Sequence, residues 1–134
     1  MPLGPWPQPM LVVRDVAASS RFYQHVLGAE SGHGGSEYEQ ILVDGEILLQ
    51  LHNAEVEHHH GRLSEPDQPV GNGVLLWFEV ADFDARVDAV RATGAEIVAD
   101  VHTNPNAKQR EIWFRDPDDY LVVLAGPSEY RARA

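Results

Sequence analysis

The chain has 134 residues, enough for one domain with a sizeable core, and its 21 acidic against 10 basic residues give a formal net charge of -11. This charge disfavours nucleic acid as a partner and favours a cationic ligand, while the lack of cysteine excludes disulfides, thiolate metal sites and cysteine nucleophiles. No apolar segment approaches the roughly 18 residues of a membrane span and no signal-like N-terminus is present, so we expect a soluble cytoplasmic protein without a membrane partner.

Four prolines among the first nine residues predict an extended arm, because proline is excluded from helix interiors and central strands. The arm carries Leu3 and Trp6, and it is either a loose terminus or a segment that packs across the partner of a homodimer. After it we expect a strand over residues 10–14 and a helix over 15–27, with Asp15 as the N-cap.

Two further strands are expected over residues 37–43 and 46–52, because Asp44-Gly45 between them favours a two-residue hairpin turn. A regular register after this turn places two carboxylates opposite two polar side chains of the second strand: Glu39 opposite Gln50, and Glu37 opposite His52. Both carboxylates would then face the same side as those polar residues.

Residues 53–73 are rich in polar side chains, Gly and Pro, and predict a linker that is too long for a plain loop. It either contains a short helix or moves. The second half then repeats the order of the first, with a helix over 82–93 and strands over 74–80, 96–101, 109–115 and 120–125. Residues 116–119, Asp-Pro-Asp-Asp, predict the turn between the last two strands.

The sequence contains an internal repeat. Residues 13–16 are Val-Arg-Asp-Val and residues 80–83 are Val-Ala-Asp-Phe, and Gly-Ala-Glu follows each at 28–30 and 94–96. An offset of about half the chain predicts a duplicated unit of strand, helix and strands. We therefore expect one α+β domain in which two modules enclose a shared cleft, with these bounds: domain 1–134, first module 8–52, linker 53–73, second module 74–126.

Side chains alternate along a strand, so each strand of the second module divides between a face beneath the helix and a face opposite it. The first set is apolar, matches apolar positions of the helix and predicts the core: Leu76, Phe78, Val80, Ile112, Phe114, Val122 and Leu124, with Phe83, Val87 and Val90. The opposite set is mixed, as in a ligand cleft: Leu75, Trp77, Glu79, Glu111, Trp113, Arg115, Leu121 and Val123. The corresponding set of the first module is Gln8, Met10, Val12, Arg14, Leu48, Gln50 and His52.

Eight of these residues are our candidates for ligand binding: Gln8, Gln50, His52, Trp77, Glu79, Glu111, Trp113 and Arg115. The two tryptophans offer platforms for a planar or apolar ligand, or they fill the space between modules or lie beneath a partner subunit. Glu79, Glu111 and His52 are the candidates for acid–base catalysis, with simple polar lining as the alternative.

The three adjacent histidines at 58–60 are a possible signal for a metal site. Such a site would need further ligands from His52, Glu37, Glu55 or Glu57. A solvated loop is the simpler interpretation of such a tract. We place His102 in a loop, as a surface residue. The chain has no nucleophile motif, phosphate loop or dinucleotide fingerprint.

Several segments resemble one superfamily in their order and spacing: residues 11–16, 21–23, 26–28, 78–82 and 113–118. Together they are similar to the vicinal oxygen chelate superfamily, which includes glyoxalase I, extradiol dioxygenases, fosfomycin-resistance transferases and bleomycin-resistance proteins. The resemblance implies a pair of βαβββ modules, each with a sheet that curls around the cleft.

The resemblance also implies where a metal would bind. In metal-dependent members, four strand positions carry His, a carboxylate or Gln, and these correspond here to Gln8, Gln50, Leu75 and Val123. Leu75 and Val123 offer no lone pair, and neutral amide oxygens are weak ligands for a divalent metal. We therefore expect no metal and no other cofactor, as in the bleomycin-resistance branch that the chain resembles most.

The function that we expect is binding and sequestration of a small organic molecule, cationic or aromatic, such as a drug or natural product, by a homodimer that confers antibiotic resistance. The first alternative is a metal-dependent lyase, isomerase or dioxygenase with a displaced site at Gln8, Gln50, His52 and nearby Glu residues. The second is a protein-interaction module in which a partner buries the tryptophans. Neither nucleic acid nor a membrane is expected as a partner.

Overall fold

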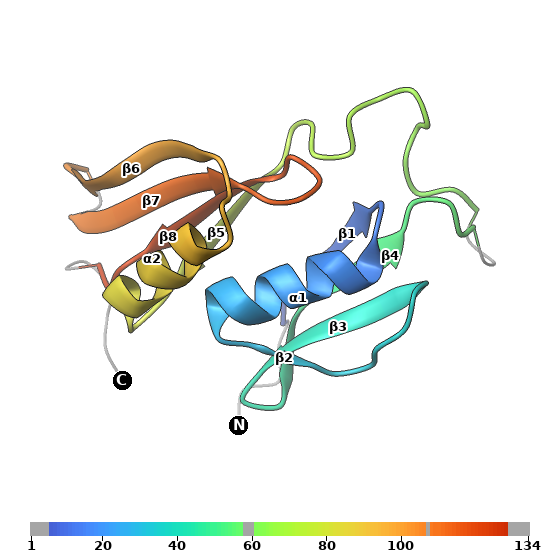
Figure 1. Cartoon of the computed structure of the whole chain (residues 1–134), viewed down its shortest axis with the longest axis horizontal. Helices are drawn as coiled ribbons and strands as arrows, with labels where there is room; N and C mark the ends of the chain where they lie inside the picture. Colours follow the sequence, from blue (N-terminus) through green and yellow to red (C-terminus); the bar gives the residue numbers. More distant parts are fainter. Residues whose placement is uncertain (1–5, 58–60, 107, 129–134) are drawn as a thin grey trace.

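Two four-stranded sheets and two helices follow one another in two similar halves in the computed structural model, which describes residues 6–57, 61–106 and 108–128 (Figure 1). The first half contains β1 (Met10–Val13), α1 (Val16–Leu27), β2 (Glu30–Ser31), β3 (Tyr38–Val43) and β4 (Glu46–Asn53). The second half contains β5 (Leu75–Glu79), α2 (Phe83–Ala92), β6 (Ile97–Asn104), β7 (Gln109–Arg115) and β8 (Leu121–Ala125). The expected α+β fold of two βαβββ modules is confirmed. Neither helix in these ranges is long and apolar enough to cross a membrane.

The two sheets have the same topology. Their strand orders are β1-β4-β3-β2 and β5-β8-β7-β6. The parallel pairs are β1 with β4 and β5 with β8, and all other neighbouring strands are antiparallel. The two helices meet near the middle of the molecule, where the C-terminal end of α1 contacts α2 (Figure 1). We call the surface of each sheet that faces away from its helix the open face.

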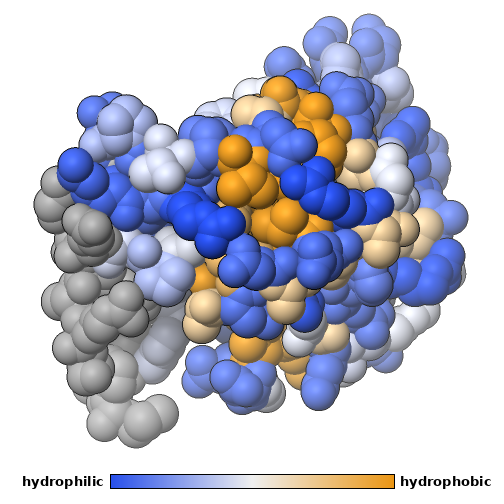
Figure 2. All heavy atoms as spheres, turned by 60° about the vertical axis from the view of Figure 1, so that its left-hand side comes forward, coloured by the Kyte–Doolittle hydropathy of each residue, from blue (hydrophilic) through white to orange (hydrophobic). Residues whose placement is uncertain are grey.

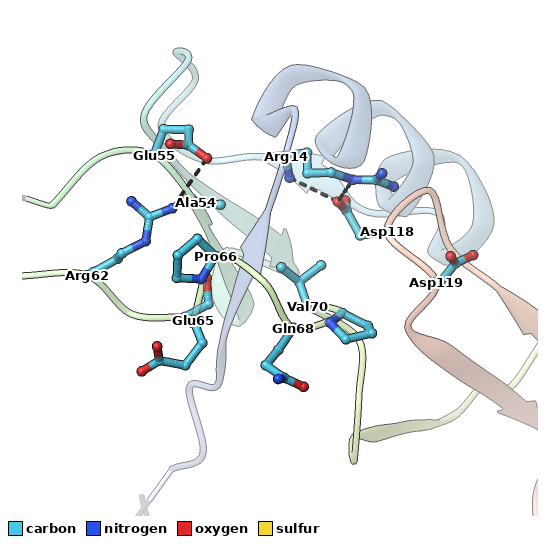
Figure 3. A pocket seen from close by; sticks show the side chains of 12 residues that line it. Arg14, Ala54, Glu55, Arg62, Glu65, Pro66, Gln68, Val70, Asp118 and Asp119 are labelled. Carbon is cyan, nitrogen blue, oxygen red and sulfur yellow. Dashed lines mark hydrogen bonds and ion pairs between the residues drawn. The ribbon is translucent and has the colours of Figure 1, made fainter.

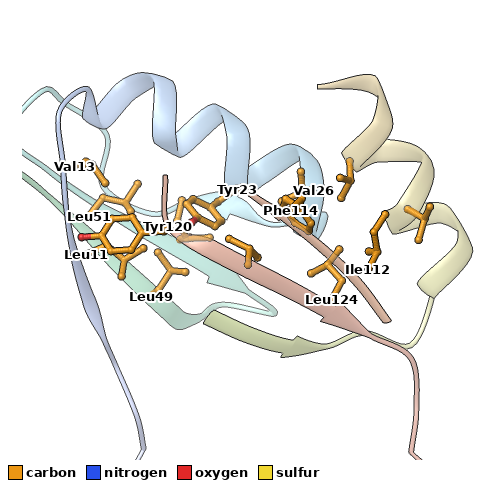
Figure 4. Packing of buried hydrophobic residues seen from close by; sticks show 14 of the residues in the cluster. Leu11, Val13, Tyr23, Val26, Leu49, Leu51, Ile112, Phe114, Tyr120 and Leu124 are labelled. Carbon is orange, nitrogen blue, oxygen red and sulfur yellow. The ribbon is translucent and has the colours of Figure 1, made fainter. Parts of the chain in front are cut away.

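A single apolar core lies beneath both helices. It joins Tyr23 and Val26 of α1 to Phe114 of β7 and to Leu49 and Leu51 of β4, all almost completely buried (Figure 4). The core set expected from strand alternation is confirmed, since Ile112, Phe114, Val122 and Leu124 are buried and Leu76, Phe78 and Val80 pack against them. The core therefore crosses from one module to the other.

The ends of the helices are fixed by specific hydrogen bonds. Asp15 is the N-cap of α1, because its Oδ1 accepts the amide of Ala18 at 3.0 Å. Asp82 holds the same place in α2 without a side-chain cap and instead pairs with Arg86 at 3.2 Å. Arg86 also donates from Nη1 to the carbonyl of His25 at 3.1 Å, so a cation of α2 stabilises the last turn of α1.

The register expected for the β3–β4 hairpin is wrong by one residue. The turn at Asp44-Gly45 is present, with φ of 51° and 78° and Val43 opposite Glu46. A bulge then shifts the register between Ile41 and Leu42, so Glu39 lies opposite Leu51 and Tyr38, rather than Glu37, lies opposite His52. Because alternation has period two, this shift turns Glu39 to the helix side of the sheet.

Glu39 is 3% exposed, and its carboxylate accepts five hydrogen bonds. Two come from the hydroxyls of Ser20 and Ser31, at 2.7 and 2.6 Å, and three from backbone amides at His33, Gly34 and Gln40. Burial alone would raise the pKa of Glu39, but these hydrogen bonds lower it to about 2. Glu39 therefore fastens the β2–β3 loop to the sheet and to α1.

The two modules are joined by a cluster of buried polar groups, which we call the junction. Asp116, 4% exposed, accepts the hydroxyl of Tyr23 at 2.6 Å, and its other oxygen accepts the amides of Asp118 and Tyr120. Asp118 accepts the backbone amide and Nε of Arg14 at 3.0 and 2.7 Å. The hydroxyl of Tyr120 donates to the carbonyl of Val12 at 2.9 Å. The Asp-Pro-Asp-Asp segment, expected as a turn only, thus also binds the second module to β1 and α1.

Other expectations need correction or comment. The short helix that is one alternative for residues 53–73 is absent from the described part of this range: Asn53 ends β4, and residues 54–57 and 61–73 form turns and irregular chain. The βαβββ pattern implies a strand after the first helix, but no range was predicted for it, and β2 is only two residues long. His102 lies in β6 rather than in a loop, because this strand continues to Asn104. The histidines at 58–60 and Leu3 of the arm lie outside the described residues.

Replacing Tyr23 by Phe should destabilise the fold by roughly 1–3 kcal/mol, because the buried Asp116 then loses its side-chain donor. The free energy of unfolding from urea titration measures this loss. Tyr38→Phe is the control, since that hydroxyl is part-buried on the open face, where water can replace it. Equal losses in the two variants would contradict the role given to the junction.

Replacing Glu39 by Gln should cost roughly 2–3 kcal/mol at neutral pH and much less in acid. The folded-state pKa lies below the unfolded value of 4.5, so the charged form stabilises the fold above that pH and this contribution is lost as pH falls towards about 2. Chemical denaturation across this range measures the difference between variant and wild type. Glu46→Gln, at an exposed position of β4, should show no such difference, and a cost of Glu39→Gln that is constant with pH would refute the assignment.

Candidate functional site

The open face of the second sheet consists of three rows of side chains that cross β5, β8 and β7. Register pairs place Leu75, Leu121 and Arg115 in one row, Trp77, Val123 and Trp113 in the next, and Glu79, Ala125 and Glu111 in the third. An aromatic row therefore separates an aliphatic row that ends in a cation from a row that carries two carboxylates.

The aromatic row forms a continuous apolar surface. Trp77 is 42% exposed and Trp113 is half-buried, whereas Val123 between them has no exposed surface although it lies outside the core beneath the helix. The two indoles on the neighbouring strands therefore shield the smaller Val123. Two ring systems on one sheet face offer a platform for a planar or apolar group.

Glu111, in the row next to the aromatic row, is buried. It is 1% exposed, and its carboxylate accepts the indole N–H of Trp113 at 3.0 Å and the amide of Asn104 at 2.8 Å. His102, directly opposite on β6, brings Nε2 to 3.4 Å from the same oxygen that binds the indole. Sequence reasoning missed Asn104 and His102 because the end of β6 was placed too early.

Glu79 is the more accessible carboxylate of this face. Its Oε1 accepts a hydrogen bond from Nε2 of Gln109 at 3.3 Å, and Gln109 also donates to the carbonyl of Gly126. Glu79 and Trp77 border an open hollow of about 400 Å³ at the seam between the modules. The remaining lining is mainly apolar: Leu27, Val43, Leu48, Phe78, Val80, Ala81 and Asp82. This volume suits a small organic molecule.

The open face of the first sheet is polar and internally hydrogen-bonded. Tyr38 donates to Oε1 of Gln50 at 2.5 Å and accepts from Gln40 at 3.2 Å, while Gln50 donates to the carbonyl of Gln8 at 2.9 Å. His52 is 4% exposed, between Val12 and Tyr38 in register, with Nδ1 2.9 Å from the carbonyl of Asn53. The three acid–base candidates are thus divided, with His52 on the first sheet and Glu79 and Glu111 on the second.

Arg115 and Arg14 are positioned by the junction. Arg115 donates from Nη1 to the carbonyl of Asp119 at 3.0 Å, beside the turn. Arg14 borders a second hollow, of about 250 Å³, between the linker and the junction (Figure 3). There it pairs with Asp118 at 2.7 Å, and Arg62 lies 3.5 Å from Glu55 on the opposite wall. Both cations of this hollow are already paired with carboxylates.

Apolar side chains also reach the surface. Figure 2, turned to bring the second module forward, shows them gathered in a patch on a mostly hydrophilic face. Three of the exposed large apolar residues, Met10, Leu75 and Trp77, belong to the open faces of the two sheets. The full set among the described residues is Trp6, Met10, Val43, Leu63, Val74, Leu75, Trp77 and Val98.

The positions that the superfamily resemblance assigns to a metal do not fit one. Leu75 is 47% exposed and Val123 is buried between the two indoles, and neither has a donor atom. The amide of Gln50 is engaged at both ends, by Tyr38 and by the carbonyl of Gln8. Nor do the described His, Asp and Glu residues form any group of three that could hold a metal ion.

Comparisons with known proteins agree with this fold. The model of the Glyoxalase/Bleomycin resistance protein/Dioxygenase superfamily matches residues 7–124. The comparison with curated proteins finds no match.

The chain is similar in structure to a protein of unknown function from Agrobacterium tumefaciens str. C58, with 24% identity, a TM-score of 0.74 and coverage of 95% of this chain and 97% of that one. It is also similar to the fosfomycin resistance protein FosX from Listeria monocytogenes complexed with Mn(II) and sulfate ion, with 20% identity, a TM-score of 0.68 and coverage of 96% and 94%. An integron cassette protein from V. cholerae matches with 21% identity, a TM-score of 0.68 and coverage of 94% and 97%. The chain belongs to the glyoxalase/bleomycin resistance protein/dioxygenase superfamily.

Proposed function

We propose that this protein binds and sequesters a small organic molecule, planar and cationic, on the open face of the second sheet. The observation that carries the proposal is the aromatic row, in which Trp77 and Trp113 flank the buried Val123 and leave indole surface accessible. Large aromatic side chains retained at the surface of a sheet cost hydrophobic free energy unless something covers them.

The charge distribution supports a cationic ligand. Glu79 borders the seam hollow next to Trp77, and the formal net charge of -11 gives the whole molecule a potential that attracts cations. No described arginine occupies the face of Trp77 or Trp113. The cation–π contact found among these residues joins Arg110 to Phe83, with 4.7 Å between the guanidinium carbon and the ring centroid. Binding of this kind is what a drug-sequestering resistance protein requires.

We propose further that binding needs no metal. The support is the donor chemistry at the superfamily's ligand positions, where Leu75 and Val123 cannot coordinate an ion and Gln50 is already hydrogen-bonded at both ends of its amide. A displaced site would require donors elsewhere on the open faces. The donors expected for such a site, Gln8, Gln50, His52 and nearby Glu residues, include no group of three His, Asp or Glu residues that could hold a metal ion within the described ranges.

The proposal includes a homodimer. Met10, Leu75 and Trp77 expose apolar surface on the open faces of both sheets, and Trp6 of the arm is 56% exposed. A second copy that covers these faces would bury this surface and deepen the cleft in which the ligand sits. Gln8 and Gln50 of the first module would then line the side of the cleft opposite the aromatic row, with His52 buried next to them.

Truncating either tryptophan should weaken binding of a planar aromatic cation by roughly tenfold, because stacking and cation–π contacts are lost. Ethidium is a suitable probe, since its own fluorescence reports binding. The comparison is between wild type, Trp77→Ala and Trp113→Ala, each checked for cooperative thermal unfolding.

Leu63→Ala is the matched control, because Leu63 is 44% exposed and lies in the linker, away from both sheets. It should bind ethidium as wild type does. Failure of wild type to bind ethidium, or binding that neither tryptophan variant weakens, would contradict the proposed function.

A further inference from the structure

Glu111 stands apart from the other carboxylates of the open face because a ligand cannot reach it. Its exposed fraction is 1%, and the platform residue Trp113 and Asn104 of β6 satisfy its two oxygens. A cation bound on the open face therefore forms no direct ion pair with Glu111. Its negative charge can act on a ligand without contact, through its field and through a neighbouring group that it polarises.

Trp113 is that neighbouring group. Its indole N–H points at Oε1 of Glu111 at 3.0 Å, and both residues lie on β7, two positions apart on the same face. This hydrogen bond fixes the rotation of the ring. An N–H that donates to a carboxylate also gives up positive charge to the acceptor, and the ring becomes richer in electrons.

The carboxylate is itself held in place. Asn104 donates to Oε2 of Glu111 at 2.8 Å, and the Oδ1 of Asn104 accepts the amide of Asn106 at 2.9 Å. His102 lies 3.4 Å from Oε1 on the side of β6. The indole of Trp77, in contrast, makes no such hydrogen bond to a carboxylate among the described residues, and it is more exposed than that of Trp113.

We infer that Glu111 is a positioning residue that tunes Trp113 into a selective platform for organic cations with a methylated or delocalised charge, such as quaternary ammonium or N-alkylated heteroaromatic groups. This inference rests on the proposed function and names the ligand class of the same site. Such cations hold water weakly and bind through the face of an electron-rich ring rather than through a point contact with a carboxylate. Glu111 thus selects for charge without touching the ligand.

The test uses a pair of probes that are similar in shape and differ in charge: phenyltrimethylammonium, and N,N-dimethylaniline at a pH where it is neutral. Calorimetry or tryptophan fluorescence gives the affinity of wild-type protein for each, and the cation should bind roughly tenfold more tightly.

The informative variant is the double substitution E111Q/N104D. In this variant the side-chain oxygen of residue 111 still accepts the indole N–H of Trp113, and its new amide donates to the carboxylate of residue 104. The indole ring therefore stays fixed, while the group that accepts its N–H is neutral.

In E111Q/N104D the ratio of the two affinities should fall by roughly three- to tenfold. The single substitution E111Q, which also removes the charge and leaves Trp113 in place, should lower the ratio in the same direction. It carries the test if the double variant fails to fold. The proton resonance of the Trp113 indole N–H should also move upfield in the double variant.

An unchanged ratio, or an equal loss of affinity for both probes, would overturn the inference. So would wild-type protein that binds ethidium but does not prefer phenyltrimethylammonium over N,N-dimethylaniline, and in that case the proposed function would still hold. Absence of binding for all three probes would contradict the proposed function and this inference with it.

Discussion

The arrangement of the whole molecule depends on the buried carboxylate of Asp116. Burial raises the pKa of this group, while hydrogen bonds from the Tyr23 hydroxyl and from the amides of Asp118 and Tyr120 work in the opposite direction. Of these three donors, Tyr23 is the one that the first module supplies. The same turn carries Asp118, which binds the backbone and side chain of Arg14. Two carboxylates of one turn therefore hold β1 and α1 of the first module against the second module.

This junction has a consequence for the surface. With α1 and α2 in contact and their apolar sides in one core, the open faces of both sheets are directed away from the helices. The side chains on those faces need not contribute to the core, and the two sheets use this freedom differently. The first carries a chain of amide and hydroxyl hydrogen bonds through Tyr38 and Gln50, and the second carries indoles beside a buried acid. A ligand between such faces would meet an apolar platform on one side and hydrogen-bonding groups on the other.

Much of the fold could be predicted from the sequence, because the repeat, the alternation in β5, β7 and β8 and the Asp15 cap are local patterns with one physical interpretation each. The register of β4 could not, since the two-residue turn does not specify the bulge between Ile41 and Leu42. That single shift moved Glu39 from the expected cleft side to a buried anchor. Likewise, a turn-forming Asp-Pro-Asp-Asp segment does not reveal that its carboxylates bind Tyr23 and Arg14 roughly a hundred residues away in the chain.

The sequence predicts which residues share a sheet face at the candidate site, but it does not predict what each of them does there. Alternation places Trp77, Trp113, Glu79 and Glu111 together, yet only side-chain contacts distinguish the accessible Glu79 from the buried Glu111. His102 and Asn104 were missed because the pattern of β6 is interrupted by two irregularities. Both residues approach Glu111 only because β6 pairs with β7, and the sequence of β6 alone does not reveal this pairing.

The central claim is that this member of a superfamily with metal-dependent enzymes binds its ligand through aromatic side chains and without a metal. Elemental analysis of untagged protein, dialysed without chelator and compared with a variant in which residues 58–60 are alanine, tests it most directly. The account predicts far less than one metal ion per chain in both proteins, with ethidium binding intact. Close to one metal ion per chain, retained in the variant, would contradict it.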